Sequence, residues 1–571
     1  MKLMQRYILL SAAVLCSVAA AAQNLDPTVE VSRAYEGKIA QAQKPTREMT
    51  VPDSVSTFRL DFDYSVFDKP YKGAYDFNPY LMSMRPTASS YKPQAFYLKA
   101  GAGYRLHPEL DLIWSPSLKK NGLNLDVYAA HRSYVGDYRN IGVAADGKLA
   151  ETDKAGRYNG YDLLSKAGVD LQYDWKAGEF GFNVDYYGLA GKYAQGYSRC
   201  YDAVDANFSI SSNKDADKNF VYDLTVDYRF GEDKMHFGAD SYLAEHLGAA
   251  NLSLGPVFKH GHRVMFDLGA EVAAYRSAVD GVAAGVNFTP RYLLRKGRWS
   301  VDAGVRLDLL FASVQPVPLY VTDNQQYVYP DVHVGFAAIK DAMNIYVAVT
   351  GGTKMNTYSS LIGDNHYFTT AYLHPSTCFF DADIERVRAT FGFRGRIASK
   401  FSYDLRGGYA NYANGLLPAV YILGDQPVAG IAYSGYQKAF AALDWRWDAE
   451  AFKFDGTVAY THEWGYQRAD WAFAPAMITG NVAFEYNWMR RVFAGVDCDF
   501  STGRHMVAVP EGTASMKIPG YADLGVFAEY AMNRKLSFWL RGGNLCCMTI
   551  QRTPLYAEGG ISFTAGICLN L

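Results

Sequence analysis

Long runs of alternating apolar and polar residues are the feature that most limits what this chain can fold into. From Trp299 to Leu309 every second residue is apolar, and the positions between them are Ser300, Asp302, Gly304, Arg306 and Asp308. A β-strand directs successive side chains to opposite faces, so this run has one apolar face and one charged face. Soluble strands usually end after about five or six residues, whereas strands that cross a bilayer at a tilt need about 9–11. The run is therefore typical of a transmembrane strand.

The same alternation recurs at 220–230, 401–409 and 452–460. In a transmembrane barrel the apolar set faces lipid and the charged set faces a wet lumen. This register predicts lumen-facing charges that either form cross-strand ion pairs or tune what passes, at Asp302, Arg306, Asp308, Asp404, Arg406 and Arg541. The alternative is a large soluble β-sandwich or propeller, which the strand length and the lack of a blade-length repeat disfavour.

Short segments rich in Gly, Asn and charged residues suit hairpin turns and divide residues 95–571 into pairs of strands. They are expected at 117–122, 176–179, 231–234, 259–263, 295–298, 340–343, 398–400, 448–450, 488–491 and 532–535. Two strands fall in each interval, with two more before the first turn and two after the last. The chain is therefore predicted to be all-β, a transmembrane antiparallel β-barrel of about 22 strands, with 20–24 as the range.

Short turns of such barrels face the periplasm and longer loops face outside, which places both termini in the periplasm. The outer loops are expected at 134–161, 191–217, 312–326, 353–383, 414–432 and 502–517. The chain contains 44 Tyr, 32 Phe and 9 Trp, and interfacial aromatic girdles would use that excess.

The N-terminal 94 residues differ in kind from the rest. Residues 1–22 read as a secretory signal, with Lys2 and Arg6, an apolar stretch at 7–18 and a run of small residues at 20–22. This predicts the outer membrane of a Gram-negative bacterium. Residues 23–94 are predicted to form a periplasmic segment, whose aromatic and Pro-bearing part at 56–86 either occludes the lumen or docks a partner. Candidate contacts for closure or docking are Phe67, Tyr71, Tyr75 and Tyr80.

Catalytic and metal-binding patterns are not found. The histidines are scattered, no nucleophile elbow occurs, and the cysteines lack metal-type spacing. Asp381 and Asp383 near Glu385 are more often a solvated face than a cation site. Asp364, His366 and His374 share one expected loop, where a protease-like arrangement is a remote alternative. The net charge of −2 gives no case for nucleic-acid binding. We therefore expect a non-enzyme without cofactor or metal.

Two stretches carry a family resemblance: 66–80 (VFDKPYKGAYDFNPY) and 97–116 (YLKAGAGYRLHPELDLIWSP). They resemble Bacteroidetes-type outer-membrane barrels that are described as TonB-dependent-receptor-like. The resemblance implies a 22-stranded barrel, which agrees with the independent turn count. True TonB-dependent receptors also carry a folded plug and a TonB-contacting segment. Residues 23–94 are too few for a normal plug and show no TonB box.

Two functional classes follow. The first is transport or gated passage of an unknown solute, which is the commonest use of large barrels. The alternative is a non-transporting scaffold of a larger outer-membrane assembly, in contact with lipid and with a periplasmic or lipoprotein partner. A barrel of this width is normally plugged. Its closure must come from the N-terminal segment, from inward-folded loops such as 353–383, or from another protein.

Overall fold

The computed structural model describes most of the chain from residue 95 onward. The described residues are 95–104, 107–116, 118, 122–143, 149–151, 156–194, 197–212, 219–237, 239–258, 261–315, 325–340, 342–369, 381–397, 400–423, 426–467, 472–507 and 515–571. They belong to one compact unit, residues 62–571. The signal sequence at 1–22, the segment 23–94 and its candidates Phe67, Tyr71, Tyr75 and Tyr80 lie outside the described residues.

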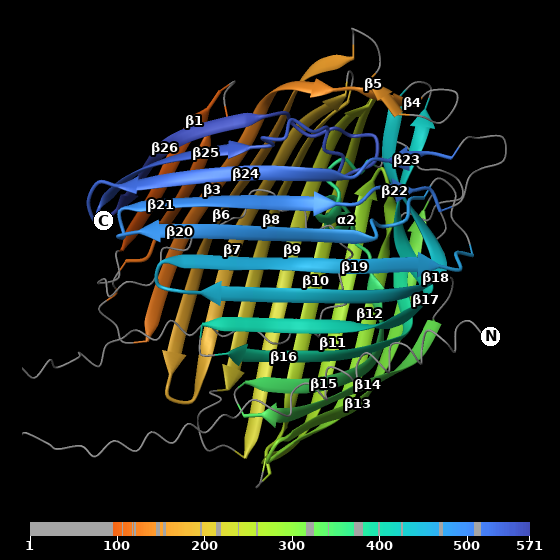
Figure 1. Ribbon diagram of the computed structural model, residues 1–571. Coiled ribbons are helices and arrows are strands. Elements are labelled where there is room, and N and C mark those ends of the chain that lie inside the picture. The colour runs from red at the N-terminus through yellow and green to blue at the C-terminus, as the bar shows by residue number, and fades with distance from the viewer. Residues whose placement is uncertain are drawn as a thin grey trace, which may run out of the picture. The chain divides into compact units, whose positions relative to one another are not determined.

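A closed barrel of 22 antiparallel strands is the main element, which confirms the predicted fold and strand number. Each strand pairs with the next along the chain, and β1 (Phe96–Gly103) pairs with β26 (Ser562–Asn570) to close the ring, with Tyr97 opposite Asn570. Figure 1 shows the strands running side by side around the wall. Closure leaves no unpaired edge, which a barrel in lipid requires. No helix among the described residues is long and apolar enough to cross a membrane.

The remaining wall strands are β2 (Glu109–Trp114), β3 (Leu123–Arg139), β6 (Arg157–Trp175), β7 (Gly178–Ala194), β8 (Tyr197–Ser212), β9 (Phe220–Phe237), β10 (Ala239–Pro256), β11 (His262–Ser277), β12 (Asp280–Lys296), β13 (Trp299–Gln315), β14 (Gln325–Ile339), β15 (Met343–Met355), β16 (Ala382–Ile397), β17 (Phe401–Leu423), β18 (Gln426–Asp448), β19 (Phe452–Trp464), β20 (Ile478–Trp488), β21 (Val492–Ser501), β24 (Tyr521–Ala531) and β25 (Leu536–Gly543). Short strand pairs β4 (Ile141–Val143) with β5 (Leu149–Glu151) and β22 (Arg504–His505) with β23 (Lys517–Ile518) lie outside the wall.

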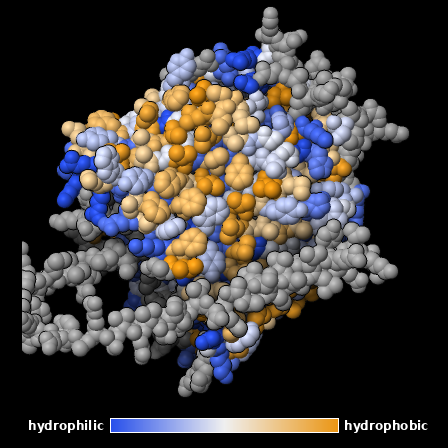
Figure 2. Space-filling model, viewed as in Figure 1, coloured by the Kyte–Doolittle hydropathy of each residue, from blue (hydrophilic) through white to orange (hydrophobic). Residues whose placement is uncertain are grey.

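The alternation along β13 separates the two faces of the wall. Val305 is 47% exposed on the outer surface, whereas Asp308 is only 3% exposed on the opposite face. Exposed apolar residues recur on other strands of the wall, for example Val226 on β9 and Phe266 on β11. Figure 2 shows the resulting apolar area over the middle of the barrel, with hydrophilic residues gathered at the end where the short turns lie. An apolar outer band around a closed barrel identifies an outer-membrane protein.

The two ends of the barrel differ in their connections. Short hairpins at 297–298, 340–342, 489–491 and 532–535 lie at one end, together with the start of β1 and the end of β26. The opposite end carries the longer connections and the helix α2 (Tyr358–Asp364). Because short turns mark the periplasmic side, α2 and the long connections lie at the outer end.

One predicted turn is wrong. Residues 231–234 were expected to form a periplasmic hairpin, but they lie inside β9, near its outer end. The hairpin lies instead between β8 and β9, so the expected outer loop at 191–217 contains the whole of β8. Glycine at position 231 allows the Tyr201 side chain to lie close to the backbone, because a Cβ there would be only 2.8 Å from the Tyr201 hydroxyl. The predicted strand number is nevertheless correct, because four strands, as expected, lie between residues 178 and 256.

A second difference concerns the expected outer loop at 414–432. These residues continue β17 and β18, which are 23 residues long each. A bilayer needs only about 9–11 residues per strand, so roughly half of this hairpin projects beyond the membrane. The projecting part is buried along most of 426–436, which indicates that other outer segments cover it.

The assignment of faces on β13 predicts an asymmetric mutational response. Val305→Arg is expected to lower the free energy of unfolding by about 2–4 kcal/mol, because it places a charge in the lipid band. Arg306→Ala should have a smaller effect, because the Arg306 side chain is 29% exposed and Asp308 keeps the hydrogen bond from the Thr353 backbone N–H. Urea unfolding of both variants in detergent micelles measures the difference, and equal losses would contradict the register.

Candidate functional site: a roof of outer segments over the lumen

The segment between β15 and β16 folds inward and forms α2. The N-cap is Thr357, whose side chain accepts a hydrogen bond from the backbone N–H of Ser360, and the Ser360 hydroxyl faces back to the N-cap in a capping box. The helix is only seven residues long and is followed at once by Asn365. It buries Tyr358, Leu361 and Ile362. We call residues 356–369 the α2 wedge.

Charged side chains of the inner wall hold the α2 wedge. Arg199 on β8 and Asp233 on β9 are both fully buried, with Arg199 Nε 3.1 Å from Asp233 Oδ2. The Tyr358 hydroxyl donates to the Asp233 carboxylate. Arg199 Nη1 donates to the carbonyl of His366 at 2.6 Å, and Nη2 donates to the carbonyl of Phe368. One guanidinium therefore binds both the wall carboxylate and two backbone carbonyls of the wedge.

A second wall carboxylate binds the start of the helix. The backbone N–H of Ser359 donates to Glu245 Oε2 of β10 at 3.0 Å. Glu245 is fully buried. A carboxylate at the first turn satisfies backbone N–H groups that have no partner within the helix. We call Arg199, Asp233 and Glu245 the latch.

Apolar packing fills the space around the latch. Tyr358, Leu361, Ile362 and Phe368 of the wedge share one buried cluster with wall residues such as Leu243 and Tyr275. The same cluster contains Ile431 and Tyr433 of β18. The α2 wedge therefore fills the gap between the inner wall at β7–β12 and the projecting hairpin of β17 and β18. Figure 1 shows α2 within the outer end of the barrel.

The hairpin is covered on its other side by further outer segments. Val420 packs with Phe473, Met506 and Leu555 in one buried cluster. Ala419 and Tyr421 pack with Ala472 in another. These residues come from β17 and from the connections after β19, β21 and β25. The projecting hairpin is thus the middle layer of a packed structure.

Segments from opposite sides of the barrel meet at a group of tyrosines. Tyr193, Tyr197, Tyr367 and Tyr556 form one buried cluster with Ala429. The Tyr556 hydroxyl donates to the carbonyl of Pro427 at 2.8 Å. The Thr553 hydroxyl donates to Asn365 Oδ1 at 2.9 Å. The α2 wedge, the hairpin 415–434 and these connections together form what we call the roof.

Burial shifts the ionisation of three groups in the roof loops. Burial, followed by the charges of Arg199 and Arg552, lowers the pKa of His366 to about 3, even though Asp162 Oδ2 of β6 lies 3.4 Å from its Nε2. Burial raises the pKa of Asp381 to about 7, although hydrogen bonds from the Ala382 backbone and the Asn414 side chain lower it. Burial also raises the pKa of Glu558 to about 7 despite the neighbouring Arg552. The closed roof therefore holds His366 neutral, and it favours the protonated form of both carboxyls.

The His366 shift predicts that acid loosens the wedge. The imidazole has a folded pKa of about 3 against about 6.5 when exposed, so its contribution is complete above pH 6.5 and is lost as pH falls. At pH 5 the loss is about 2 kcal/mol, or roughly 30-fold in the open population. Asp381 and Glu558 act in the opposite sense, because their raised pKa values favour closure as pH falls.

His366→Gln separates these contributions. Wedge opening is measured by thiol labelling of a cysteine at position 243 at pH 7.5 and pH 5. The labelling rate of the chain with His366, divided by the rate of the His366→Gln variant, should rise about 30-fold between pH 7.5 and pH 5. A ratio that does not change with pH would contradict a neutral, buried His366.

The six charged residues predicted to face the lumen do not form one cluster. Asp302 accepts from Arg291 Nη1 at 3.3 Å, and Arg306 Nε donates to Asp308 at 2.7 Å. Arg406 Nη1 lies 2.5 Å from Asp444 and 3.7 Å from Asp404. Arg541 lies apart on β25, opposite Thr564 of β26. Asp308 also accepts from the backbone N–H of Thr353 at 2.8 Å, so it supports the base of the wedge.

The remaining acidic candidates have structural partners. Asn414 donates to Asp381 Oδ2 at 2.8 Å, and the backbone N–H of Leu416 donates to Asp383 at 2.8 Å. Glu385 pairs with Arg388 at 2.7 Å. These carboxylates anchor the base of the projecting hairpin. No group of three potential metal ligands occurs among the residues that the structure describes.

The latch was missed by sequence reasoning. Arg199 fell in an expected loop and Asp233 in an expected turn, because Gly-Glu-Asp-Lys at 231–234 is typical turn chemistry. The signal that does exist is alternation, since Tyr197, Arg199 and Tyr201 share one face, as do Gly231, Asp233 and Met235. A charge among apolar residues on one face indicates a buried partner.

Comparisons with known proteins agree with the barrel. No family model and no curated protein matches the chain. Among solved structures, the FrpB iron transporter from Neisseria meningitidis has a TM-score of 0.62 at 9% identity, covering 84% of this chain and 82% of that one. The copper transporter OprC has 0.61 at 11%, covering 85% and 81%. The siderophore receptor PiuA from Acinetobacter baumannii has 0.60 at 10%, covering 84% and 82%.

Identities this low establish the fold alone. The fold is that of outer-membrane receptor and transporter barrels, as the resemblance implied.

Proposed function

We propose that this chain is a gated outer-membrane barrel for solute passage, in which the α2 wedge is the movable part of the roof. The observation that carries the proposal is how the wedge is held. The projecting hairpin is a continuation of wall strands β17 and β18 and shares their ladder of hydrogen bonds. The wedge is bound to the wall mainly by side chains, at the latch and in the apolar cluster.

Displacing the wedge alone costs much less free energy than opening the complete roof. Exposing its five large buried side chains, Tyr358, Leu361, Ile362, Tyr367 and Phe368, costs roughly 7.5–15 kcal/mol at about 1.5–3 kcal/mol each. A ligand bound with nanomolar affinity releases about 12 kcal/mol. The binding free energy of a tightly bound solute is therefore of the same order as the cost of displacing the wedge alone. Opening the complete roof would also expose two further buried clusters, which exceeds what one ligand supplies. We infer that gating is local to the wedge.

A second candidate function is a non-transporting scaffold that carries periplasmic or lipoprotein partners. The observation that favours it is the extent of the seal, since the outer end is packed like a protein interior. In the scaffold the rest of that seal would keep the barrel closed even without the wedge. Residues 23–94, which are short for a plug and lack a TonB box, would then serve docking. A Bacteroidetes origin stays a prediction of the sequence resemblance.

Excising the wedge distinguishes the two functions. Residues 357–369 are replaced by a Gly-Ser linker of equal length, and the sensitivity of intact cells to a large glycopeptide antibiotic is measured. The gated barrel predicts increased sensitivity for this variant. A Gly-Ser replacement of residues 508–514, in the segment between β22 and β23, is the control and should leave sensitivity unchanged. Unchanged sensitivity after wedge excision, together with a stoichiometric periplasmic partner on purification, would favour the scaffold.

A further inference from the structure

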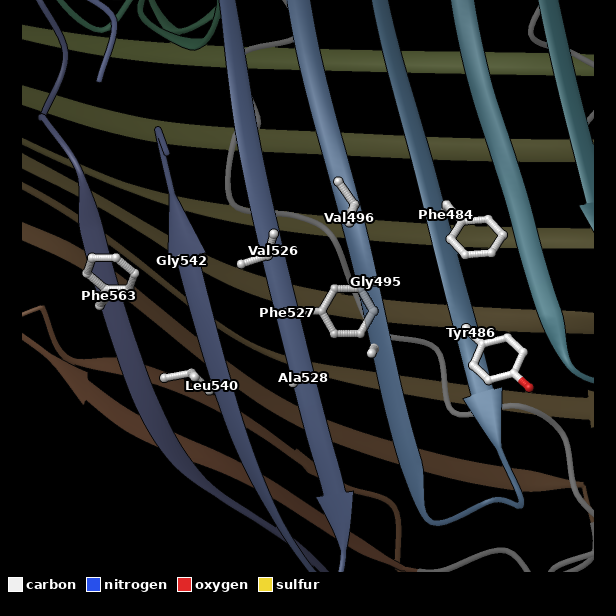
Figure 3. Close-up of a pocket in the computed structure, with 11 residues that line it drawn as sticks. Phe484, Tyr486, Gly495, Val496, Val526, Phe527, Ala528, Leu540, Gly542 and Phe563 are labelled. Atoms are coloured by element: carbon white, nitrogen blue, oxygen red, sulfur yellow. The ribbon is translucent and has the colours of Figure 1, made fainter. Parts of the chain in front are cut away.

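A groove crosses the lipid-facing surface of the barrel over strands β20 to β26. It has a volume of about 460 Å³ and is lined almost entirely by apolar groups. Figure 3 shows Phe484 and Tyr486 on β20, Val496 on β21, Leu540 on β25 and Phe563 on β26 around it. All five side chains are exposed on the outer surface. The groove therefore opens toward the acyl chains of the bilayer.

Small residues form the depression. Ala494 on β21 lies opposite Ala528 on β24 in the ladder, and both face outward. Gly542 on β25 adds a third position without a large side chain, beside Phe563. The aromatic and branched residues around these positions make the walls. A linear apolar group can lie along this depression, in contact with the apolar residues that line it.

The periplasmic end of the groove is strongly basic. The hairpin at 489–491 carries Arg490 and Arg491, and the neighbouring hairpin at 532–535 carries Arg534 and Lys535. The two hairpins touch, since the backbone N–H of Ala531 donates to the carbonyl of Arg491 at 2.7 Å. Glu450 pairs with Arg490 at 3.6 Å in an exposed setting. The two hairpins themselves carry four cationic side chains and no carboxylate, so this rim is positive.

The groove and the basic rim are spaced like the two parts of a lipid. Arg491 is three residues from Ala494 along β21, which corresponds to about 10 Å at roughly 3.3 Å per residue. Trp488, at the end of β20, is exposed at this level, where aromatic side chains mark the membrane interface. The charged hairpins therefore lie at the headgroup level of the periplasmic leaflet, and the groove lies among its acyl chains.

We propose that this surface binds an anionic phospholipid of the periplasmic leaflet, with one acyl chain in the groove and the phosphate on Arg490, Arg491, Arg534 and Lys535. Charge complementarity selects this occupant. A second copy of the chain, inserted in the same orientation, would bring its own basic hairpins against these and would be repelled. A neutral lipid offers no charge complementary to this positive rim. The lipid is independent of the gate, because the groove lies on the outer surface and the wedge on the inner one.

The test compares lipid retention by native mass spectrometry after delipidation in mild detergent and titration with defined lipids. Dioleoylphosphatidylglycerol should be retained at least tenfold more tightly than dioleoylphosphatidylcholine. The Arg490→Gln, Arg491→Gln double variant should lose this preference. Ala528→Phe fills the floor and should abolish retention of both lipids. Each variant must also show the heat-modifiable migration of a folded barrel.

Matched controls lie elsewhere on the barrel. Arg295→Gln with Arg298→Gln removes two cations from the β12–β13 hairpin, and Ala270→Phe enlarges an outward alanine on β11. Both should retain phosphatidylglycerol like the unmodified chain. Equal retention of the two lipids, or full retention by Ala528→Phe, would overturn the proposal. So would a lipid A or acylated-protein mass on the native protein in place of a phospholipid.

Discussion

Replacing Arg199 with Gln is expected to raise the labelling rate of a cysteine at position 243 by at least about 100-fold. Leu243 is completely buried behind the α2 wedge, so a membrane-impermeant maleimide reaches Leu243→Cys only when the wedge leaves the wall. Removing one partner of a buried ion pair costs about 3–5 kcal/mol, because Asp233 then stays buried without its counter-charge. The rate is measured on intact cells, in a chain whose exposed cysteines are replaced by Ser.

The structure offers a matched control for this experiment. Arg229 on β9 pairs with Asp205 on β8, across the same two strands as Arg199 and Asp233. The Arg229 side chain is 36% exposed and the Asp205 side chain is 25% exposed. An ion pair of this exposure contributes about 0–1 kcal/mol. Arg229→Gln should therefore change the labelling rate by less than about fivefold. Similar rates in the Arg199→Gln and Arg229→Gln backgrounds would show that the latch does not hold the wedge.

Deleting residues 56–86 is expected to raise permeability strongly in the wedge-excised chain and only weakly in the chain with an intact roof. The physical reason is that two barriers in series are limited by the tighter one. The N-terminal segment is a proposed second barrier, whose Pro70 and Pro79 restrict the backbone. Sensitivity to the glycopeptide antibiotic is compared among the two single deletions and the double deletion.

Partner recovery on purification is the second measurement in that series. Loss of a periplasmic partner, without a change of permeability in either background, would make residues 56–86 a docking element. No change in permeability or in partner recovery would remove the segment from both roles, and the roof would then be the only proposed closing element.

The wall could be predicted from sequence because its rules are local. On β13 the alternation of apolar and polar residues predicts the face on which each side chain lies. The outward positions of Val305 and Leu307 therefore follow from the sequence alone. The hairpins at 295–298 and 532–535 were equally readable from their Gly, Asn and charged residues. Strand number followed from counting such turns and from the need of a barrel to close.

The roof could not be predicted in this way, because its contacts join residues that are far apart in the chain. Arg199 and Tyr358 are separated by 159 positions. The local sequence around Asp233 reads as a turn, and only the distant Arg199 makes a buried carboxylate acceptable there. Gly231 was interpreted as a turn residue, whereas its lack of a side chain makes room for Tyr201 of the neighbouring strand β8, which is distant in the sequence. The sequence did name residues 353–383 among three means of closure, but it did not show which side chains hold them.

Planar-bilayer conductance of the purified chain tests the central claim most directly, because it measures closure without cells or partners. The roof predicts that the full-length chain stays closed at low voltage. Replacing residues 357–369 by a Gly-Ser linker, combined with deletion of 56–86, should give a stable open pore. A full-length chain that conducts like the double variant would contradict closure by the roof, and a double variant that remains closed would contradict the α2 wedge as the gate.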